Sequence, residues 1–273
     1  MTGQATAKEA LALARLLADE ADAITLALYR RRHELTAAMK VDLTEVTDAD
    51  RTVEDRLRRL LRVHDPHRGV LGEERGPSGD QQARWLLDPI DATCNFLWGL
   101  DWWATLLALE VDGEVEVAMI SAPALGRRWW ASRDGGAYTT HPLHAIPQPM
   151  LVSQADDLED AHLAYGDLRR DPWFLELAAR CWRTRGIGDF LMFCLVAEGA
   201  MDVAVGQDGD QLWDLAAPKL LVEEAGGRFT DLAGRPRADG GVGLASNGLL
   251  HQAVLDAIPP SAVLPAPLGD RGG

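Results

Sequence analysis

Two aspartates, Asp88 and Asp91, stand three positions apart on either side of a Pro-Ile pair, directly after the apolar run 85–87. Because Pro89 has no N–H for the next ladder position and favours an extended residue before it, we predict that a strand ends at Asp88. Carboxylates on the following turn, beside the hydroxyl of Thr93, are oxygen ligands of the kind that a hard metal ion prefers. The same residue types are common in solvated turns, so this stretch alone leaves both interpretations open.

Two further acidic segments favour the metal site. Glu73 and Glu74 follow the short apolar run 69–71, and Asp214 opens a predicted helix that stops at the glycine pair 226–227. A helix N-terminus carries partial positive charge and unpaired N–H groups, so an anion and its counter-cation tend to gather there. The three segments together therefore predict a site for a metal ion and an anionic ligand.

The chain of 273 residues carries a formal net charge of −15. This charge argues against nucleic acid as a partner, because phosphate backbones are held by Lys and Arg. It would also repel a small phosphate ester, so an acidic protein with such a substrate needs bound cations. No apolar run reaches the length of a membrane span, which argues against a membrane partner, and three cysteines without metal-ligand spacing favour a reducing cytoplasm.

Hydrophobic periodicity predicts a long N-terminal helix over residues 5–32, with a buried stripe formed by Leu11, Leu13, Leu16, Leu17, Ile24 and Leu28. A second helix should follow Thr47, and strand-like patterns come next, at 102–111, 114–120 and 127–132. The Pro-containing stretch 141–149 interrupts the pattern, and helix-like and strand-like segments alternate beyond it. We therefore expect an α+β half that holds the predicted site for a metal ion and an anionic ligand (1–145), an α/β half (146–258) and a mobile tail (259–273).

Three motifs in a fixed order resemble a known family. They are Gly-Glu-Glu at 72–74, Asp-Pro-Ile-Asp-Ala-Thr at 88–93, and Trp-Asp-Leu-Ala-Ala at 213–217 with Glu-Ala-Gly-Gly at 224–227. This set resembles the inositol monophosphatase superfamily of magnesium-dependent, lithium-sensitive phosphomonoesterases, and the likeness runs from about residue 42 to about residue 247. Softer cues, such as Gly-Asp-Phe-Leu at 188–191, are most similar to the actinobacterial histidinol-phosphate phosphatases. The resemblance implies a layered α-β-α-β-α sandwich, with elements of both α+β and α/β type.

The resemblance also implies roles for particular residues. Two or three Mg²⁺ ions per site, with Li⁺ as an inhibitor, are expected on the side chains of Glu73, Asp88, Asp91 and Asp214 and the backbone carbonyl of Ile90. Thr93, assisted by Asp48, is expected to orient and activate the attacking water, with Glu73 as a further catalytic residue. The backbone N–H groups of Ala92 and Thr93 should contact the phosphate. Glu74 is expected to be only a solvated or neighbouring residue.

Four residues are expected to face the substrate: Asp91, Arg185, Asp189 and Gln207. Two of the expected site positions depart from the family pattern. Ala92 stands where the family has glycine, and it would be strained if its φ is positive. Gln207 stands where the family often has glutamate, so Asp208 and Asp210 could supply the missing charge, although a Gly-flanked acidic loop favours solvated side chains.

The leading functional hypothesis is a phosphomonoesterase acting on histidinol phosphate. The alternatives are the same chemistry on inositol monophosphate or a phosphorylated intermediate of secondary metabolism, hydrolysis of a phosphoadenosine nucleotide, and a degenerate protein that binds a phosphometabolite without turnover. The resemblance further implies a homodimer. We expect the Trp-rich strands around Trp102, Trp103, Trp129 and Trp130 to offer aromatic surface for it.

Overall fold

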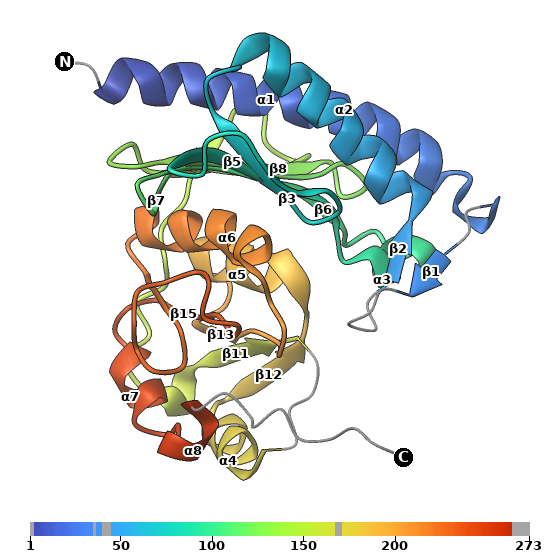
Figure 1. Ribbon diagram of the computed structural model, residues 1–273. Helices are drawn as coiled ribbons and strands as arrows, with labels where there is room; N and C mark the ends of the chain where they lie inside the picture. The colour runs from blue at the N-terminus through green and yellow to red at the C-terminus, as the bar shows by residue number, and fades with distance from the viewer. Residues whose placement is uncertain (1–2, 35–36, 40–44, 167–170, 264–273) are drawn as a thin grey trace.

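The computed structural model describes residues 3–34, 37–39, 45–166 and 171–263. Five layers follow one another in space (Figure 1): helices α1 and α2, a large sheet, helices α5 and α6, a smaller sheet, and helices α4, α7 and α8. This arrangement confirms the expected α-β-α-β-α sandwich.

The helices are α1 (Gly3–Tyr29), α2 (Asp48–His64), α3 (Thr93–Trp98), α4 (Pro172–Arg180), α5 (Asp189–Ala197), α6 (Leu212–Glu224), α7 (His251–Leu255) and α8 (Pro260–Val263). The strands of the large sheet, in spatial order, are β10 (Gln148–Pro149), β9 (Ala137–Thr140), β8 (Arg127–Ser132), β7 (Glu114–Ala122), β6 (Ala104–Val111), β5 (Ala83–Asp91), β3 (Gly69–Gly72) and β4 (Gly76–Ser78). Those of the smaller sheet are β12 (Arg183–Gly186), β11 (His162–Tyr165), β13 (Val203–Val205), β15 (Leu244–Ser246) and β14 (Arg228–Thr230). Strands β1 (Ala37–Met39) and β2 (Glu45–Thr47) form a separate antiparallel pair.

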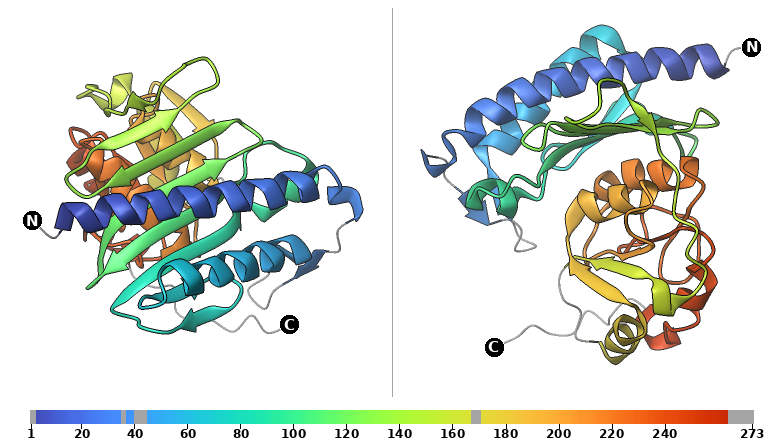
Figure 2. Two further views of the ribbon diagram at one scale, coloured as in Figure 1. Left: turned by 90° about the horizontal axis from the view of Figure 1, so that it is seen from above. Right: turned by 180° about the vertical axis from the view of Figure 1, so that it is seen from behind.

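Helix α1 lies across the outer face of the large sheet (Figure 2). The predicted leucine stripe is only partly right, because Leu17 is buried whereas Leu16 is exposed. The face against the sheet is instead formed mainly by small side chains at helical spacing: Ala10, Ala14, Ala18 and Ala21. Alanine allows the helix backbone to approach the sheet closely, so the larger leucines lie at the edges of the contact.

The prediction that a strand ends at Asp88 is wrong, because strand β5 continues to Asp91. The ladder with β6 pairs Asp88 with Leu106 and Asp91 with Ala104, so β5 carries one more residue than its partner between these pairs. This is a β-bulge, which lets a strand absorb a proline that cannot donate to the ladder. The hydroxyl of Thr105 donates to the carbonyl of Pro89 at 2.8 Å and so satisfies a backbone acceptor within the bulge.

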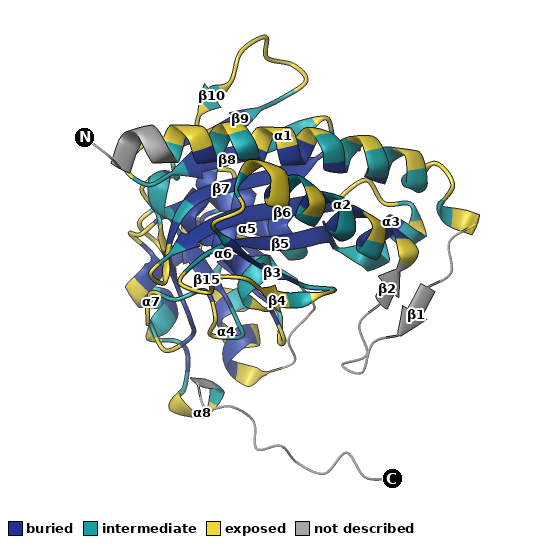
Figure 3. Ribbon diagram, turned by 45° about the horizontal axis from the view of Figure 1, so that its top comes forward, coloured by how far each residue is buried: buried dark blue, intermediate teal, exposed yellow. Residues whose placement is uncertain are grey.

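The inner face of the large sheet packs on helices α5 and α6, which also touch the smaller sheet. A helix covered on both sides must be largely apolar, and residues 215–222 of α6 are all buried. The one charged side chain among them, Lys219, pairs with Glu223 at 2.8 Å. Three of the four tryptophans predicted to be surface, Trp103, Trp129 and Trp130, belong to buried clusters as well, and the central strands of the large sheet are largely buried (Figure 3). The expected aromatic patch is therefore wrong for these three, and only Trp102 is exposed.

Strand β10 still pairs with β9 of the large sheet, and the smaller sheet begins with β11. The chain therefore changes sheet after Pro149, slightly beyond the expected boundary at residue 145. Of the segment predicted to be a mobile tail, Pro260–Val263 forms helix α8, and residues 264–273 lie outside the described residues. Within the described ranges, no helix is both long and apolar enough to cross a membrane.

Candidate active site

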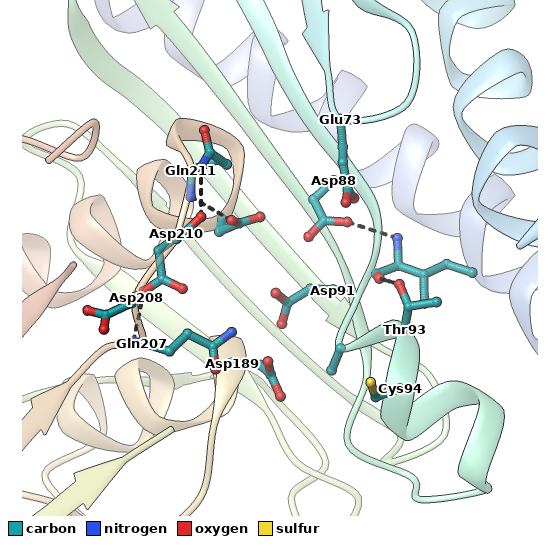
Figure 4. Close-up of a pocket in the computed structure, with 14 residues that line it drawn as sticks. Glu73, Asp88, Asp91, Thr93, Cys94, Asp189, Gln207, Asp208, Asp210 and Gln211 are labelled. Atoms are coloured by element: carbon teal, nitrogen blue, oxygen red, sulfur yellow. Dashed lines mark hydrogen bonds between the residues drawn. The ribbon is translucent and has the colours of Figure 1, made fainter. Parts of the chain in front are cut away.

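A pocket of about 320 Å³ lies where the large sheet meets the C-terminal half (Figure 4). Its N-terminal wall consists of Glu73, Asp88, Ile90, Asp91, Ala92, Thr93 and Cys94. Its C-terminal wall consists of Asp189, Gln207, Asp208, Gly209, Asp210, Gln211 and Asp214. The structure thus brings together all the predicted site residues except Asp48 and Arg185.

The bulge in β5 explains how Asp88 and Asp91 come to share one pocket. In a regular strand, residues three positions apart point to opposite faces of the sheet. The extra residue in the bulge shifts this alternation by one, so both carboxylates turn to the inner face. The N–H of Ile90 donates to Asp88 Oδ1 at 3.0 Å, and the N–H of Phe190 donates to Asp91 Oδ2 at 2.9 Å. The second bond ties β5 to the start of α5.

Asp214 reaches the same point from the C-terminal half. It lies in the first turn of α6, where its Oδ2 accepts the N–H of Gln211 at 2.7 Å as part of a capping box. One carboxylate oxygen each from Asp88, Asp91 and Asp214 lie within 4.8 Å of one another, a spacing that a metal ion can bridge. Glu73, at the end of β3, lies beside Asp88 (Figure 4).

The electrostatics of this group call for a cation. Burial raises the pKa of Asp88 well above its usual range, and the neighbouring charges of Glu73 and Asp91 raise it further. Burial and the charges of Asp189 and Asp214 raise the pKa of Asp91 in the same way. The pKa of Asp214 rises to about 7, again mainly through burial. Oxygen donors that are buried and mutually repulsive fit a hard divalent cation, which would neutralise them in place of protons.

The partner of Thr93 is Asp50, and the prediction of Asp48 is wrong. Thr93 Oγ1 lies 3.2 Å from Asp50 Oδ1 and 3.1 Å from the carbonyl oxygen of Ile90. Helix α2 begins at Asp48, whose side chain is 81% exposed, whereas Asp50 is fully buried. Successive residues of an α-helix are rotated by about 100°, so side chains two positions apart point to nearly opposite sides. Asp48 therefore faces solvent, whereas Asp50 faces α3.

Two non-glycine residues of the pocket have positive φ angles. Ala92, the N-cap of α3, has φ 65° and ψ 50°, so the strain expected for alanine in place of glycine is present. Asp189 has φ 59°, a conformation that aspartate tolerates better than alanine. Asn95 Nδ2 donates to Asp189 Oδ2 at 3.3 Å and so links the two walls near these positions. Non-glycine residues in this region are uncommon and cluster at functional sites.

The loop of the C-terminal wall differs from the expectation of a solvated acidic segment. Asp208 is exposed, but Asp210 is only 8% exposed, and its Oδ2 accepts the N–H of Gln207 at 3.2 Å. Burial, together with the charge of Asp214, raises the pKa of Asp210 well above its usual range. Gln207 lines the pocket with its amide directed towards Asp189 (Figure 4).

Arg185 does not reach the pocket. It is exposed on β12, the edge strand of the smaller sheet, and its Nη1 donates to the carbonyl of Thr184 at 2.8 Å. Its predicted contact with substrate is therefore not supported. Glu74 is not solvated either, because its side chain is 4% exposed and lies 4.0 Å from Arg51. The sequence reasoning missed Asp50 as a site residue, and it expected Asp210 to be solvated, whereas both acids are buried.

Known proteins resemble this chain over most of its length. The model of the inositol monophosphatase family matches residues 7–260. The chain is 45% identical over 254 residues to a histidinol-phosphatase of Mycobacterium tuberculosis, which covers 90% of this chain and 96% of that protein. It is 43% identical over 255 residues to a histidinol-phosphatase of Streptomyces coelicolor, with 90% and 95% covered. The crystal structure of extragenic suppressor protein SuhB from Bartonella henselae matches with a TM-score of 0.82 at 28% identity and covers 91% of this chain and 97% of that one. The protein is a member of the inositol monophosphatase family.

Proposed function

We propose that the protein is a magnesium-dependent phosphatase that hydrolyses histidinol phosphate to histidinol and inorganic phosphate. The observation that carries this proposal is the charge of the pocket. Among the described residues that line it there is no Lys or Arg, but there are seven carboxylates: Glu73, Asp88, Asp91, Asp189, Asp208, Asp210 and Asp214. Four of these suit a metal centre, which leaves three to attract a cation on the alcohol part of the ester.

The proposed metal ligands are the carboxylates of Glu73, Asp88, Asp91 and Asp214 and the carbonyl of Ile90, with two or three magnesium ions per site and inhibition by lithium. Bound magnesium would lower the pKa of a water molecule and neutralise the phosphate oxygens. The protein's own contribution is to hold these oxygen donors in fixed positions on β5 and α6. The raised pKa values of Asp88, Asp91 and Asp214 support the proposal, because such a group is unstable in its charged form without a cation.

Thr93 and Asp50 are proposed to handle the proton of the attacking water. The hydroxyl hydrogen of Thr93 can point to Asp50, which is fully buried and therefore a fixed acceptor. The lone pairs of Thr93 Oγ1 are then free to accept a hydrogen from the water and to set its direction. Glu73 is a further proposed catalytic residue, and the backbone N–H groups of Ala92 and Thr93, which line the same wall, are proposed to contact the phosphate.

The leaving alcohol is proposed to lie against the C-terminal wall. Histidinol carries an ammonium group and a titratable imidazole, and a charged hydrogen bond to a carboxylate is worth about 1.5–3 kcal/mol. Asp189 and Asp210 offer such carboxylates, with Asp91 and Gln207 as further contacts. Inositol monophosphate is the second candidate. Gln207 favours it, because an amide can donate to and accept from neutral hydroxyl groups.

A panel of phosphate esters tests the proposal, with released phosphate measured in magnesium. We expect histidinol phosphate to have the highest kcat/KM, followed by inositol monophosphate, and chelation to abolish both activities. A higher kcat/KM for inositol monophosphate would overturn the choice of substrate. Binding of the esters without release of phosphate would identify a non-catalytic member of the family.

A homodimer and a cytoplasmic location complete the proposal. Two aromatic side chains, Trp98 and Trp102, are exposed and offer apolar surface to a second copy. In the described part of the chain, Cys94, Cys181 and Cys194 form no disulfide, which suits a reducing compartment. Light scattering at micromolar concentration should give about twice the 29.7 kDa mass of the chain, and a monomer mass would contradict the dimer.

A further inference from the structure

Glu54 is a fully buried carboxylate on the inner side of α2. Its Oε2 accepts the N–H of Glu74 at 2.7 Å, and its Oε1 accepts the N–H of Arg75 at 3.2 Å. These two donors directly follow Glu73 in the chain. The carboxylate therefore holds the backbone of the turn that presents Glu73 to the pocket.

Arg58, one helical turn further along α2, completes the arrangement. Its Nε donates to Glu54 Oε1 at 2.7 Å, so the buried carboxylate has a charged partner. The guanidinium also donates to Ser78 Oγ at 2.8 Å and to the carbonyl of Gly76. Glu54 thus binds the turn between β3 and β4, and Arg58 binds strand β4 directly after the turn.

The glycine before Glu73 shows how close this contact is. A Cβ atom at Gly72 would lie 2.2 Å from Glu54 Oε1, so the carboxylate occupies the space that any side chain at residue 72 would need. On the other side, the N–H of Glu73 donates to the carbonyl of Leu87 at 3.1 Å. The backbone around Glu73 is therefore fixed from two directions, by strand β5 and by Glu54.

We propose that Glu54 is a positioning residue of the metal site, which sets the place of Glu73 through the backbone N–H groups of residues 74 and 75. The inference rests on the proposed role of Glu73 as a metal ligand. Asp50 lies four positions before Glu54, on the same face of α2. One helix thus orients both the Thr93 hydroxyl and the Glu73 turn, and it sets their relative position.

The substitution Glu54→Gln tests whether the Glu54 carboxylate positions the Glu73 turn or is only a buried side chain. Glutamine has nearly the same shape, but only one of its two terminal atoms accepts, so one N–H of the turn meets an amide donor instead of an oxygen. Groups that orient a metal ligand typically change metal affinity by about 10-fold to 100-fold. We expect magnesium binding, measured by calorimetry on the full chain, to weaken by ~10-fold or more. The kcat at saturating magnesium should stay within ~3-fold of the parent value.

The matched control is Asp55→Asn. Asp55 is the next residue of α2 and contacts the same turn, but through the exposed side chain of Arg75, with Nη2–Oδ2 at 2.8 Å. We expect unchanged magnesium affinity for this variant. Glu54→Asp, which keeps the charge but retracts the oxygens, serves if Glu54→Gln does not fold, and it should also weaken magnesium binding.

Glu73→Gln in the same titration distinguishes the positioning role of Glu54 from the ligand role of Glu73. If Glu73→Gln weakens magnesium binding and neither Glu54 variant does, the positioning role is wrong while the metal site stands. If Glu73→Gln leaves magnesium binding unchanged, Glu73 is not a metal ligand, and the positioning role of Glu54 is wrong as well. A lower Tm of the Glu54 variants with unaltered magnesium affinity would reduce Glu54 to a structural group and overturn the inference.

Discussion

The two walls of the pocket are built in different ways. On the N-terminal wall, Asp88 and Asp91 belong to a central strand of the large sheet, and each accepts a hydrogen bond from a backbone N–H. On the C-terminal wall, residues 207–211 form a loop in which Asp208 is exposed and Gly209 has φ 101°. Asp189 and Asp214 are the exceptions on that side, because they lie in the first turns of α5 and α6.

This difference separates chemistry from selectivity. Groups that hold metal ions and a water must keep their relative positions to within a fraction of an ångström, and strands and buried helices supply that rigidity. Groups that only recognise the alcohol can lie on a loop, where a substitution changes charge without disturbing a sheet. Substitutions on the N-terminal wall should therefore act on turnover, and those on the C-terminal wall on the choice of substrate.

The largest effect is expected from Asp91→Asn. The substitution keeps the shape and the bond from the Phe190 N–H but removes a charge from the proposed metal group, so activity should fall by more than ~10,000-fold, the upper end for a group that only positions or transfers a proton. The folded state should survive in a thermal melt. The equivalent change on the other wall, Asp210→Asn, should mainly raise KM for histidinol phosphate. Equal losses of kcat in the two variants would remove the distinction between the walls.

Thr93→Val tests the water-orienting pair. Valine has a similar volume without the hydroxyl, so kcat should fall by ~100-fold to 10,000-fold while magnesium binding persists in calorimetry. Asp50→Asn should have a similar effect. Asp48→Asn, two residues away but exposed, should leave kcat within ~2-fold, and a loss there as large as that of Asp50→Asn would contradict the assignment.

Gln207→Glu probes the C-terminal wall alone. An added carboxylate near the leaving alcohol favours an ammonium group, so the ratio of kcat/KM for histidinol phosphate over inositol monophosphate should rise about 10-fold, the lower end for a charged hydrogen bond. Steady-state kinetics on both esters measures the ratio. A lower ratio, in favour of inositol monophosphate, would show that Gln207 does not lie beside the amino group of histidinol phosphate.

The smallest effect is expected from Ala92→Gly. A left-handed alanine is strained by about 1–2 kcal/mol, and glycine relieves this strain but gains about 0.4–1 kcal/mol of entropy in the unfolded state. The free energy of unfolding in urea should therefore rise by about 0.5–1 kcal/mol, with little change in kcat. A decrease in the free energy of unfolding would mean that Ala92 is not strained at positive φ.

Much of the site could be predicted from the order of its acidic motifs, because Asp88, Asp91, Glu73 and Asp214 all line the pocket. A further signal was present but unused. Asp50 and Glu54 occupy the same buried face of α2 as Val53, Leu57 and Leu61. A carboxylate in an apolar stripe needs a partner, so both acids could have been singled out by helical periodicity.

The sequence by itself determined the family, the proposed metal-ligand motifs and the departures at Ala92 and Gln207, since these depend only on residue type and order. The tertiary structure alone decided that β5 continues through Pro89, because a bulge exists only against a partner strand. It also decided that Asp50 rather than Asp48 meets Thr93, since the first residue of α2 fixes which way each later side chain points. The burial of Asp210 and the contact of Glu54 with the Glu73 turn likewise arise from segments that are distant in the chain and adjacent in space.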